Sequence, residues 1–281
     1  MLKQRVITAL VLLAILLPAL FYPSPVPFAA VALVFMGAGA WEWGRLNGLA
    51  GAASVGLGAV CVAMCGAAWA AGWLHQPLPW LWAAGGAAWV LCGALLLRGG
   101  VAGWPHVPRL LRIVGGVLAL WLAWLAVAQA RVAGINYLLS VLTLVWMADI
   151  AAYFAGRAFG LKFTKNKLAP AISPGKSWEG VWGGMLGVLL LAVCWAWADA
   201  HWHAQVPSLY SHLAHRGWWL LPIGAVFMAA MSVVGDLVES LIKRSAGVKD
   251  SSGLLPGHGG VLDRIDALLP TLPLAMMLSR F

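Results

Sequence analysis

The sequence contains few charged residues. Asp, Glu, Lys and Arg make up 10% of its 281 residues, whereas 62% of the residues are hydrophobic. Ordinary soluble domains carry about 25% charged residues, and a compact water-soluble fold of this length could not enclose so much apolar side chain in one core. The composition therefore excludes a soluble globular domain, and it also excludes a disordered chain.

Cysteine is also scarce. The chain has four cysteines, and all of them lie in apolar stretches, where they act as small hydrophobic residues: Cys61, Cys65, Cys92 and Cys194. This placement excludes a secreted scaffold that is held together by disulfides.

Long apolar stretches, by contrast, recur along the whole chain. A helix that spans a bilayer takes about 17 to 25 such residues. The first stretch follows Lys3 and Arg5 as in a signal peptide, but no small-residue cleavage site follows it, so we expect it to be retained. We predict an all-α polytopic membrane protein with about nine transmembrane helices, near residues 6–22, 26–41, 52–73, 79–97, 113–130, 135–157, 178–198, 218–242 and 260–279.

Positive charge is distributed unevenly between the predicted loops. With the N-terminus inside, 15 of the 18 Lys and Arg residues fall on one side of the membrane, and such an excess marks the cytoplasmic side. The net charge of +9 therefore reflects orientation in the membrane, and we expect no nucleic-acid partner. The three basic residues predicted on the other side are Arg131, Arg216 and Arg280.

Acidic residues are almost missing from the first half of the chain. Glu42 is the only one of the nine acids that precedes Asp149. We therefore predict two regions, with N-terminal transmembrane scaffold helices in residues 1–134 and a C-terminal catalytic region with cytoplasmic loops in residues 135–281.

Acidic residues interrupt two of the predicted transmembrane segments. Asp149 is in one segment, and Asp236 and Glu239 are in another, three residues apart and so on one face of the helix. A carboxylate at membrane depth costs about 2.5 to 3.5 kcal/mol on insertion scales, so it usually faces a polar cavity or a partner. A hydrogen bond or ion pair between helices is the simpler alternative, but the closely spaced pair favours a functional site.

The most polar stretch of the chain runs from Ser240 to Asp266. Together with Asp236 it offers three groups that phosphate chemistry uses: carboxylates suited to a hard cation such as Mg²⁺, cations that pair with phosphate oxygens, and glycines and hydroxyls that let backbone N–H groups approach an anion. A glycine- and serine-rich loop alone is usually only a loop, but this one adjoins two carboxylates in a membrane segment. The three groups are Asp236, Asp263 and Asp266; Lys243, Arg244, Lys249 and Arg264; and Ser251, Ser252, Gly253, Gly257, Gly259 and Gly260.

A second polar stretch, from Lys162 to Glu179, falls on the same predicted side of the membrane. Its end, residues 173–178, leads into an apolar helix whose free N–H groups and dipole favour an anion. The stretch is not a Walker motif, and a loop that binds lipid headgroups is the alternative interpretation. We predict that residues 173–178 contact phosphate.

The polar stretch resembles the signature of the phosphatidate cytidylyltransferases, also called CDP-diacylglycerol synthases. That signature reads Ser-x-x-Lys-Arg-x4-Lys-Asp and then Pro-x-His-Gly-Gly-x-x-Asp-Arg-x-Asp, and residues 240–266 match every fixed position. The segments 149–160 and 172–180 are also similar to that family, so the resemblance covers most of residues 145–270. Two departures, Ala267 in place of Ser and Gly175 in place of Lys, leave every carboxylate present.

The resemblance implies a reaction in which CTP and phosphatidate give CDP-diacylglycerol and pyrophosphate. It also implies Mg²⁺ with a K⁺ beside it, a homodimer surrounded by membrane lipids, and an active site on the cytoplasmic face of a bacterial inner membrane. Phosphatidate supplies the nucleophile, so the protein's task is to hold two polyanions together and to stabilise the leaving pyrophosphate.

The resemblance also assigns roles to individual residues. Asp236 and Asp263 are the implied metal ligands. His258 is an implied proton carrier, although a His between glycines is equally often a loop residue held by backbone hydrogen bonds. The catalytic set is Asp149, Glu239, Lys249, Asp250, His258, Arg264 and Asp266, and the substrate-binding set is Ser173, Lys176, Ser177, Trp178, Ser240, Lys243, Arg244, Ser251, Ser252, Gly259 and Gly260.

Two other functions stay open at the level of sequence. Another CTP-dependent membrane lipid nucleotidyltransferase or kinase would use the same residues, and an ion-coupled transporter would use the intramembrane acids as an ion path. Four histidines in a loop predicted to face outward could bind Zn²⁺, but solvated loop residues are favoured because no Cys and no close acid beyond Asp199 completes a site. These histidines are His201, His203, His212 and His215.

Overall fold

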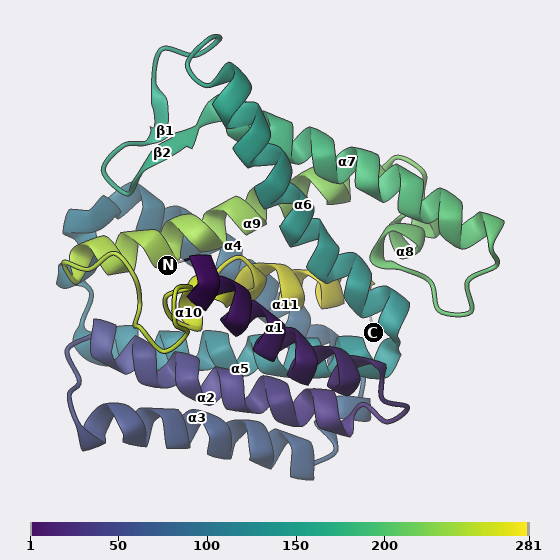
Figure 1. Cartoon of the computed structure of the whole chain (residues 1–281). Helices are drawn as coiled ribbons and strands as arrows, with labels where there is room; N and C mark the ends of the chain where they lie inside the picture. Colours follow the sequence, from purple (N-terminus) through teal and green to yellow (C-terminus); the bar gives the residue numbers. More distant parts are fainter. Residues whose placement is uncertain (1, 280–281) are drawn as a thin grey trace.

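The computed structural model describes residues 2–279, and helices dominate it (Figure 1). Eight helices within these residues are long and apolar enough to span a membrane. The prediction of an all-α polytopic membrane protein is therefore confirmed. The eight helices are α1 (Leu2–Phe21), α2 (Val26–Leu46), α3 (Ala52–Ala70), α4 (Pro79–Gly103), α5 (Arg109–Ala133), α6 (Ile135–Phe159), α7 (Trp178–His201) and α9 (Leu220–Ser245).

The ninth predicted segment, residues 260–279, differs from the prediction. It forms two short helices, α10 (Leu262–Ile265) and α11 (Leu268–Ser279). The 12 residues of α11 rise only about 18 Å, whereas the hydrocarbon core of a bilayer is about 30 Å thick. Most of α11 is buried against α4, α5 and α9, so its apolar residues fill the protein core.

The remaining elements are short and lie in the connections. The strands β1 (Lys167–Ala169) and β2 (Ser173–Ser177) pair as an antiparallel hairpin. This hairpin is not predicted from the sequence. The helix α8 (Leu209–Arg216) and two 3₁₀ turns, η1 (Trp73–His75) and η2 (Trp104–His106), complete the structure. The hairpin projects from the bundle beside the start of α7 (Figure 1).

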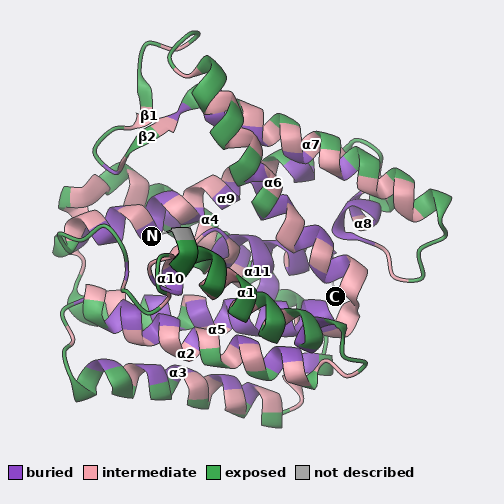
Figure 2. Ribbon diagram, viewed as in Figure 1, coloured by how far each residue is buried: buried purple, intermediate pink, exposed green. Residues whose placement is uncertain are grey.

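The buried centre of the bundle is made by α5, α9 and α11, while α1 lies on the outside (Figure 2). Large apolar side chains are exposed all around the outer helices, among them Leu10, Leu91 and Leu190. A soluble monomer rarely exposes contiguous apolar surface on this scale. This outer surface therefore fits a lipid environment, and the protein is an integral membrane protein.

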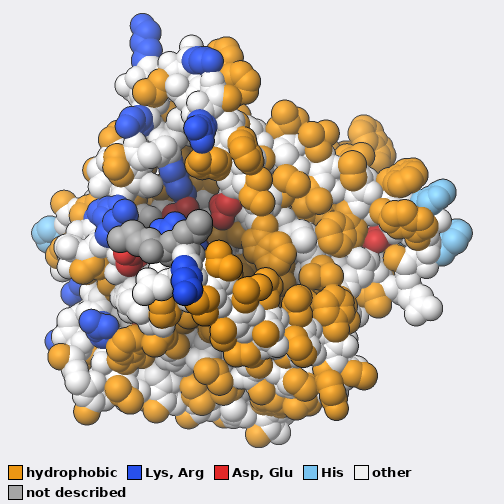
Figure 3. Space-filling view, viewed as in Figure 1, with side chains coloured by type: hydrophobic (Ala, Val, Ile, Leu, Met, Phe, Trp, Pro, Cys, Tyr) orange, Lys and Arg blue, Asp and Glu red, His pale blue; other side chains and the backbone are white. Residues whose placement is uncertain are grey.

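The predicted loops gather at two ends of the bundle as the charge pattern indicates. At one end, Arg109 donates to the carbonyl oxygens of Asn47 (3.0 Å) and Gly48 (2.6 Å), and the Thr8 hydroxyl donates to the Pro256 carbonyl (2.9 Å). Lys and Arg side chains cluster toward this end of the visible face, and none shows at the opposite end (Figure 3). We call the end that holds these basic loops the basic end.

Two of the three arginines predicted for the other side bind the ends of helices. Arg131 is buried and donates to the carbonyls of Leu20 (2.9 Å) and Tyr22 (2.5 Å), where α1 ends. Arg216 donates to the carbonyls of Leu278 and Ser279, where α11 ends. The last carbonyl groups of a helix lack hydrogen-bond partners within the helix. Both arginines therefore stabilise helix ends by donating to these carbonyls. Arg280 lies outside the described residues.

Small residues allow α6 and α7 to pack closely. A Cβ atom on Gly183 would lie 2.1 Å from the Cβ of Ala155, and one on Gly184 would lie 2.9 Å from the carbonyl oxygen of Ala148. Glycines spaced four apart commonly permit such contact between membrane helices. This interface fixes α6, which carries Asp149, against α7, which begins directly after Lys176 and Ser177.

The α6–α7 interface predicts a difference between two glycines in helix interiors. We expect Gly183→Ala to lower the free energy of unfolding by about 1 to 3 kcal/mol, the usual cost of overpacking. Gly115→Ala on α5 is the matched control, because nothing lies within 4 Å of its Cβ position and Ala favours a helix by about 1 kcal/mol over Gly. Thermal unfolding of the purified variants in detergent tests this, and equal Tm values would contradict the close approach.

Candidate active site

The polar residues near the C-terminus meet at the basic end, where α9, the following loop and α10 come together. Lys243, in the last turn of α9, lies between two carboxylates. Its ammonium is 2.5 Å from Oε2 of Glu239, one turn earlier, and 2.5 Å from Oδ1 of Asp263 in α10. These side chains are largely buried, so the cation and the two acids depend on one another for charge compensation.

Asp263 accepts hydrogen bonds from several parts of the loop. Its Oδ2 receives the Ser251 N–H (2.9 Å), the Ser251 hydroxyl (2.9 Å) and the Gly260 N–H (2.7 Å). Burial alone would raise the pKa of Asp263, but the hydrogen bonds from Lys243, Gly260 and Ser251 outweigh burial and lower the pKa below its usual value. The carboxyl group therefore stays ionised at neutral pH.

The hairpin brings a second lysine to α9. Lys176, in β2, forms an ion pair with Oδ2 of Asp236, and the Ser240 hydroxyl donates to Oδ1 of the same carboxylate (3.2 Å). Arg244 donates to the carbonyl of Ile172 (3.3 Å), which ties the hairpin to the end of α9. Residues 60 positions apart in the sequence thus form one polar cluster.

Three carboxylates act on one another within this cluster. Asp149 on α6 interacts electrostatically with Asp236 and with the cations Lys176 and Arg264. Burial, together with the nearby charges of Asp236 and Asp149, raises the pKa of Asp266 to about 7. The structure therefore brings together Asp149, Asp236 and Asp266, three of the acids that the family resemblance assigns to the site.

One residue of this site, Glu42, is missed by the sequence analysis. Glu42 lies on α2 in the N-terminal half and is fully buried. It accepts hydrogen bonds from the hydroxyls of Ser251 (3.0 Å) and Ser252 (2.5 Å), and from the backbone N–H groups of Val261 (2.9 Å) and Leu262 (2.8 Å). The high cost of a carboxylate in an apolar helix, applied above to Asp149, would have singled out Glu42 as well.

Glu179 has a comparable role for the second polar stretch. It is buried at the start of α7, and its Oε1 accepts from the N–H groups of Phe163 (3.1 Å) and Thr164 (2.7 Å) and from the Thr164 hydroxyl (2.8 Å). Ser177 caps α7 by accepting from the Gly180 N–H (3.2 Å). The prediction that this stretch leads directly into a helix is confirmed.

The other predicted residues lie at the same end of the bundle but make fewer polar contacts. Trp178, Lys249, Asp250 and Arg264 are exposed, and Ser173 begins β2. His258 donates its backbone N–H to the carbonyl of Leu255, and its Nδ1 is buried without a hydrogen-bond partner among the described residues. Their individual roles stay predictions.

No group of three or more His, Cys, Asp or Glu side chains is arranged to hold a metal ion within residues 2–279. Two of the histidines in the loop predicted to face outward contact aromatic rings: His201 stacks on Trp197 with ring centroids 4.9 Å apart, and His212 packs edge-on against Tyr137 at 5.8 Å.

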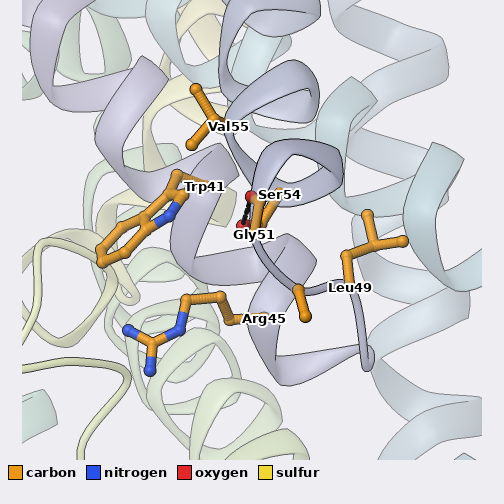
Figure 4. A pocket seen from close by; sticks show the side chains of 7 residues that line it. Trp41, Arg45, Leu49, Gly51, Ser54 and Val55 are labelled. Atoms are coloured by element: carbon orange, nitrogen blue, oxygen red, sulfur yellow. Dashed lines mark hydrogen bonds between the residues drawn. The ribbon is translucent and has the colours of Figure 1, made fainter.

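A shallow pocket of ≈ 390 Å³ lies where α2 joins α3 (Figure 4). It is lined by Trp41, Arg45, Leu49, Ala50, Gly51, Ser54 and Val55, and Arg45 lies over the Trp41 ring at 4.9 Å. None of the predicted site residues lines this pocket. The polar cluster at the ends of α9 and β2 is therefore the better candidate for an active site.

Comparison with known proteins identifies relatives along the whole chain. The Cytidylyltransferase family model matches residues 3–281. A protein of Pseudomonas aeruginosa named phosphatidate cytidylyltransferase is 40% identical over 97% of this chain and 95% of its own length. A Haemophilus influenzae protein of the same name is 38% identical over 97% and 96%, respectively, and one from Staphylococcus epidermidis is 39% identical over 53% and 51%.

The raised pKa of Asp266 predicts a pH effect on stability. Unfolded Asp ionises near pH 4, whereas Asp266 in the folded protein ionises near pH 7, so the folded state binds more protons in between. The contribution of Asp266 therefore makes the free energy of unfolding fall as the pH rises from about 4 to about 7. We expect Asp266→Asn to remove this component, so that its Tm rises relative to wild type between pH 5 and pH 8.

The matched control for this measurement is Asp250→Asn, which changes an exposed acid in the same loop. Its Tm should follow the wild-type pH dependence. If Asp266→Asn also runs parallel to wild type across the whole range, the assignment of the raised pKa to Asp266 is wrong.

Proposed function

Because the chain belongs to the cytidylyltransferase family, we propose that it transfers CMP from CTP to phosphatidate, giving CDP-diacylglycerol and pyrophosphate. The observation that carries this proposal is the similarity, over 97% of the chain, to two bacterial proteins named phosphatidate cytidylyltransferase. Family membership favours this nucleotidyltransferase over the ion-coupled transporter. The polar cluster at the basic end of a membrane bundle supports a reaction between a water-soluble nucleotide and a lipid.

The proposed reaction is an in-line displacement at the α-phosphorus of CTP. A phosphate oxygen of phosphatidate forms the new P–O bond, and the bond between the α-phosphorus and its bridging oxygen to the β-phosphate breaks, releasing pyrophosphate. Such transfers rely on positioning and on charge stabilisation more than on a protein nucleophile. Lys176, Lys243 and Arg264 are the cations that the cluster offers to the phosphates.

The residues of the cluster fit a hard divalent cation such as Mg²⁺. The proposed ligands are Asp236 and Asp263, and each already pairs with a cation: Lys176 pairs with Asp236, and Lys243 pairs with Asp263. The protein would supply one or two carboxylates and the substrate phosphates the remaining ligands, which is the usual arrangement for Mg²⁺. When bound, Mg²⁺ would neutralise charge that develops on the transferred and leaving phosphates.

The orientation in the membrane is also part of the proposal. We place the basic end, and with it the active site, on the cytoplasmic face of a bacterial inner membrane. The gathering of basic loops at one end supports this orientation, because Lys and Arg near helix ends are retained in the cytoplasm. A K⁺ ion beside Mg²⁺ and a homodimer, both implied by the family resemblance, stay predictions.

The direct test is incorporation of labelled CTP into lipid by the purified protein. With phosphatidate and Mg²⁺ present, we expect labelled CDP-diacylglycerol and an equal amount of pyrophosphate. Parallel reactions with an isoprenoid ether lipid or a polyprenol, and with CTP labelled at the γ-phosphate, distinguish other lipid acceptors and a kinase. No product from phosphatidate beside an active relative would rule out the proposed function.

The metal assignment predicts a specific effect of Asp263→Asn. An amide cannot balance the charge of Lys243 and binds Mg²⁺ weakly, so we expect activity to fall about 100-fold and half-maximal activity to need more Mg²⁺. The assay is a Mg²⁺ titration of the initial rate per folded molecule. Asp199→Asn is the control, because Asp199 is a hydrogen-bonded acid at the opposite end that accepts from Asn136, Ser208 and Ser211. An unchanged Mg²⁺ dependence in Asp263→Asn would show that the metal assignment is wrong.

A further inference from the structure

Glu42 occupies an unusual place for a carboxylate. It lies within a transmembrane helix, is 0% exposed, and forms no ion pair among the described residues. All four of its donors are uncharged and belong to the loop and helix formed by residues 251–262. Burying such a carboxylate is costly unless its hydrogen bonds are fully formed. The burial of the Glu42 carboxylate therefore requires this loop conformation, and the Glu42 carboxylate in turn stabilises it.

We propose that Glu42 is a positioning residue for the transfer reaction: from the N-terminal half, it fixes the 251–262 loop so that Asp263 faces Lys243. This inference rests on the proposed function. Among the described residues, Glu42 forms no hydrogen bond or ion pair with Lys243 or Asp263, and it acts through the loop that carries Asp263.

The link between Glu42 and Asp263 runs through one hydroxyl group. The Ser251 hydroxyl lies 3.0 Å from Oε2 of Glu42 and 2.9 Å from Oδ2 of Asp263. A hydroxyl has one proton and donates to one acceptor at a time, so the two carboxylates share a single donor. A continuous polar chain thus runs from α2 through Ser251 and Asp263 to Lys243 on α9.

The space around Gly260 shows how closely the loop fits Glu42. A Cβ atom at this position would lie 2.0 Å from the Ser251 hydroxyl oxygen and 2.4 Å from Oε1 of Glu42. Only glycine leaves room for both contacts. The same residue donates its N–H to Asp263 (2.7 Å), so a displacement of the loop at Glu42 would move a donor of Asp263 as well.

The substitution Glu42→Gln tests whether the carboxylate of Glu42 fixes the loop. The N–H of Val261 points to Oε1 and the N–H of Leu262 points to Oε2. Whichever way a glutamine amide turns, its NH₂ group faces one of these backbone donors, so the loop must shift although the side chain keeps its size. Glu42→Asp keeps both acceptor oxygens but is one methylene shorter, and we expect it to restore part of the activity.

We expect Glu42→Gln to lower kcat about 10- to 100-fold, the effect of misplacing a reactive group by about 1 Å, with a smaller change in KM for CTP. Hydrogen exchange without substrates or metal supplies a second readout. The amides of Ser251 and Gly260, which bond to Asp263 and not to Glu42, should exchange faster together with those of Val261 and Leu262. In the double variant with Ser251→Ala, the two losses of kcat should be less than multiplicative, because both substitutions break the same link.

The control is Asp199→Asn, which disturbs a comparable hydrogen-bonded carboxylate far from the loop. It should lower Tm without changing exchange at Ser251 and Gly260. The inference is overturned if Glu42→Gln lowers Tm but leaves kcat per folded molecule unchanged, or if faster exchange stops at Val261 and Leu262. A wild-type protein inactive on phosphatidate and CTP would instead reject the proposed function, and the exchange experiment would then decide whether Glu42 positions Asp263.

Discussion

The structure of the basic end depends on the burial of Lys243 between Glu239 and Asp263. These two carboxylates and the ammonium group are largely shielded from water. Their burial is tolerated only when the ammonium lies close to both carboxylates, because an unpaired buried charge costs several kcal/mol. Glu239 precedes Lys243 by one turn of α9, so helix geometry alone brings these two together. Asp263 must be brought back by the chain, and the loop after α9 does this.

The return of the chain to Lys243 accounts for the short helices that end the described structure. Residues 246–261 turn at the basic end instead of entering the bundle, and α10 then presents Asp263. The 12 residues of α11 are too few to span the bilayer, and this helix packs inside the bundle against α4, α5 and α9. Residues 260–279, which hydropathy predicts as a ninth transmembrane helix, therefore contribute a core helix. Hydropathy cannot separate the two cases, because a helix buried in protein and a helix buried in lipid are both rich in apolar residues.

Hydropathy and spacing predict much of this architecture because the relevant signals are local. Apolar runs locate all eight spanning helices, and the positions of Asp236, Glu239 and Lys243 follow from helix periodicity. Contacts between distant residues leave no such signal: Lys176 meets Asp236 across 60 positions, and Glu42 meets Ser251 across 209. The β1–β2 hairpin is missed because its polar residues lack the alternation that marks a strand.

The two lysines of the cluster also suggest how substrates and metal would depend on each other. In the described structure Lys176 neutralises Asp236 and Lys243 neutralises Asp263. An anionic substrate that draws either lysine to its phosphates would leave a carboxylate without its cation, and a second cation would then be favoured beside it. Because binding effects are reciprocal, a divalent cation on the carboxylates would in turn release the lysines for phosphate. We therefore expect the proposed nucleotide and a divalent cation to bind more tightly together than either would alone, with Glu42 keeping Asp263 in place while its partner changes.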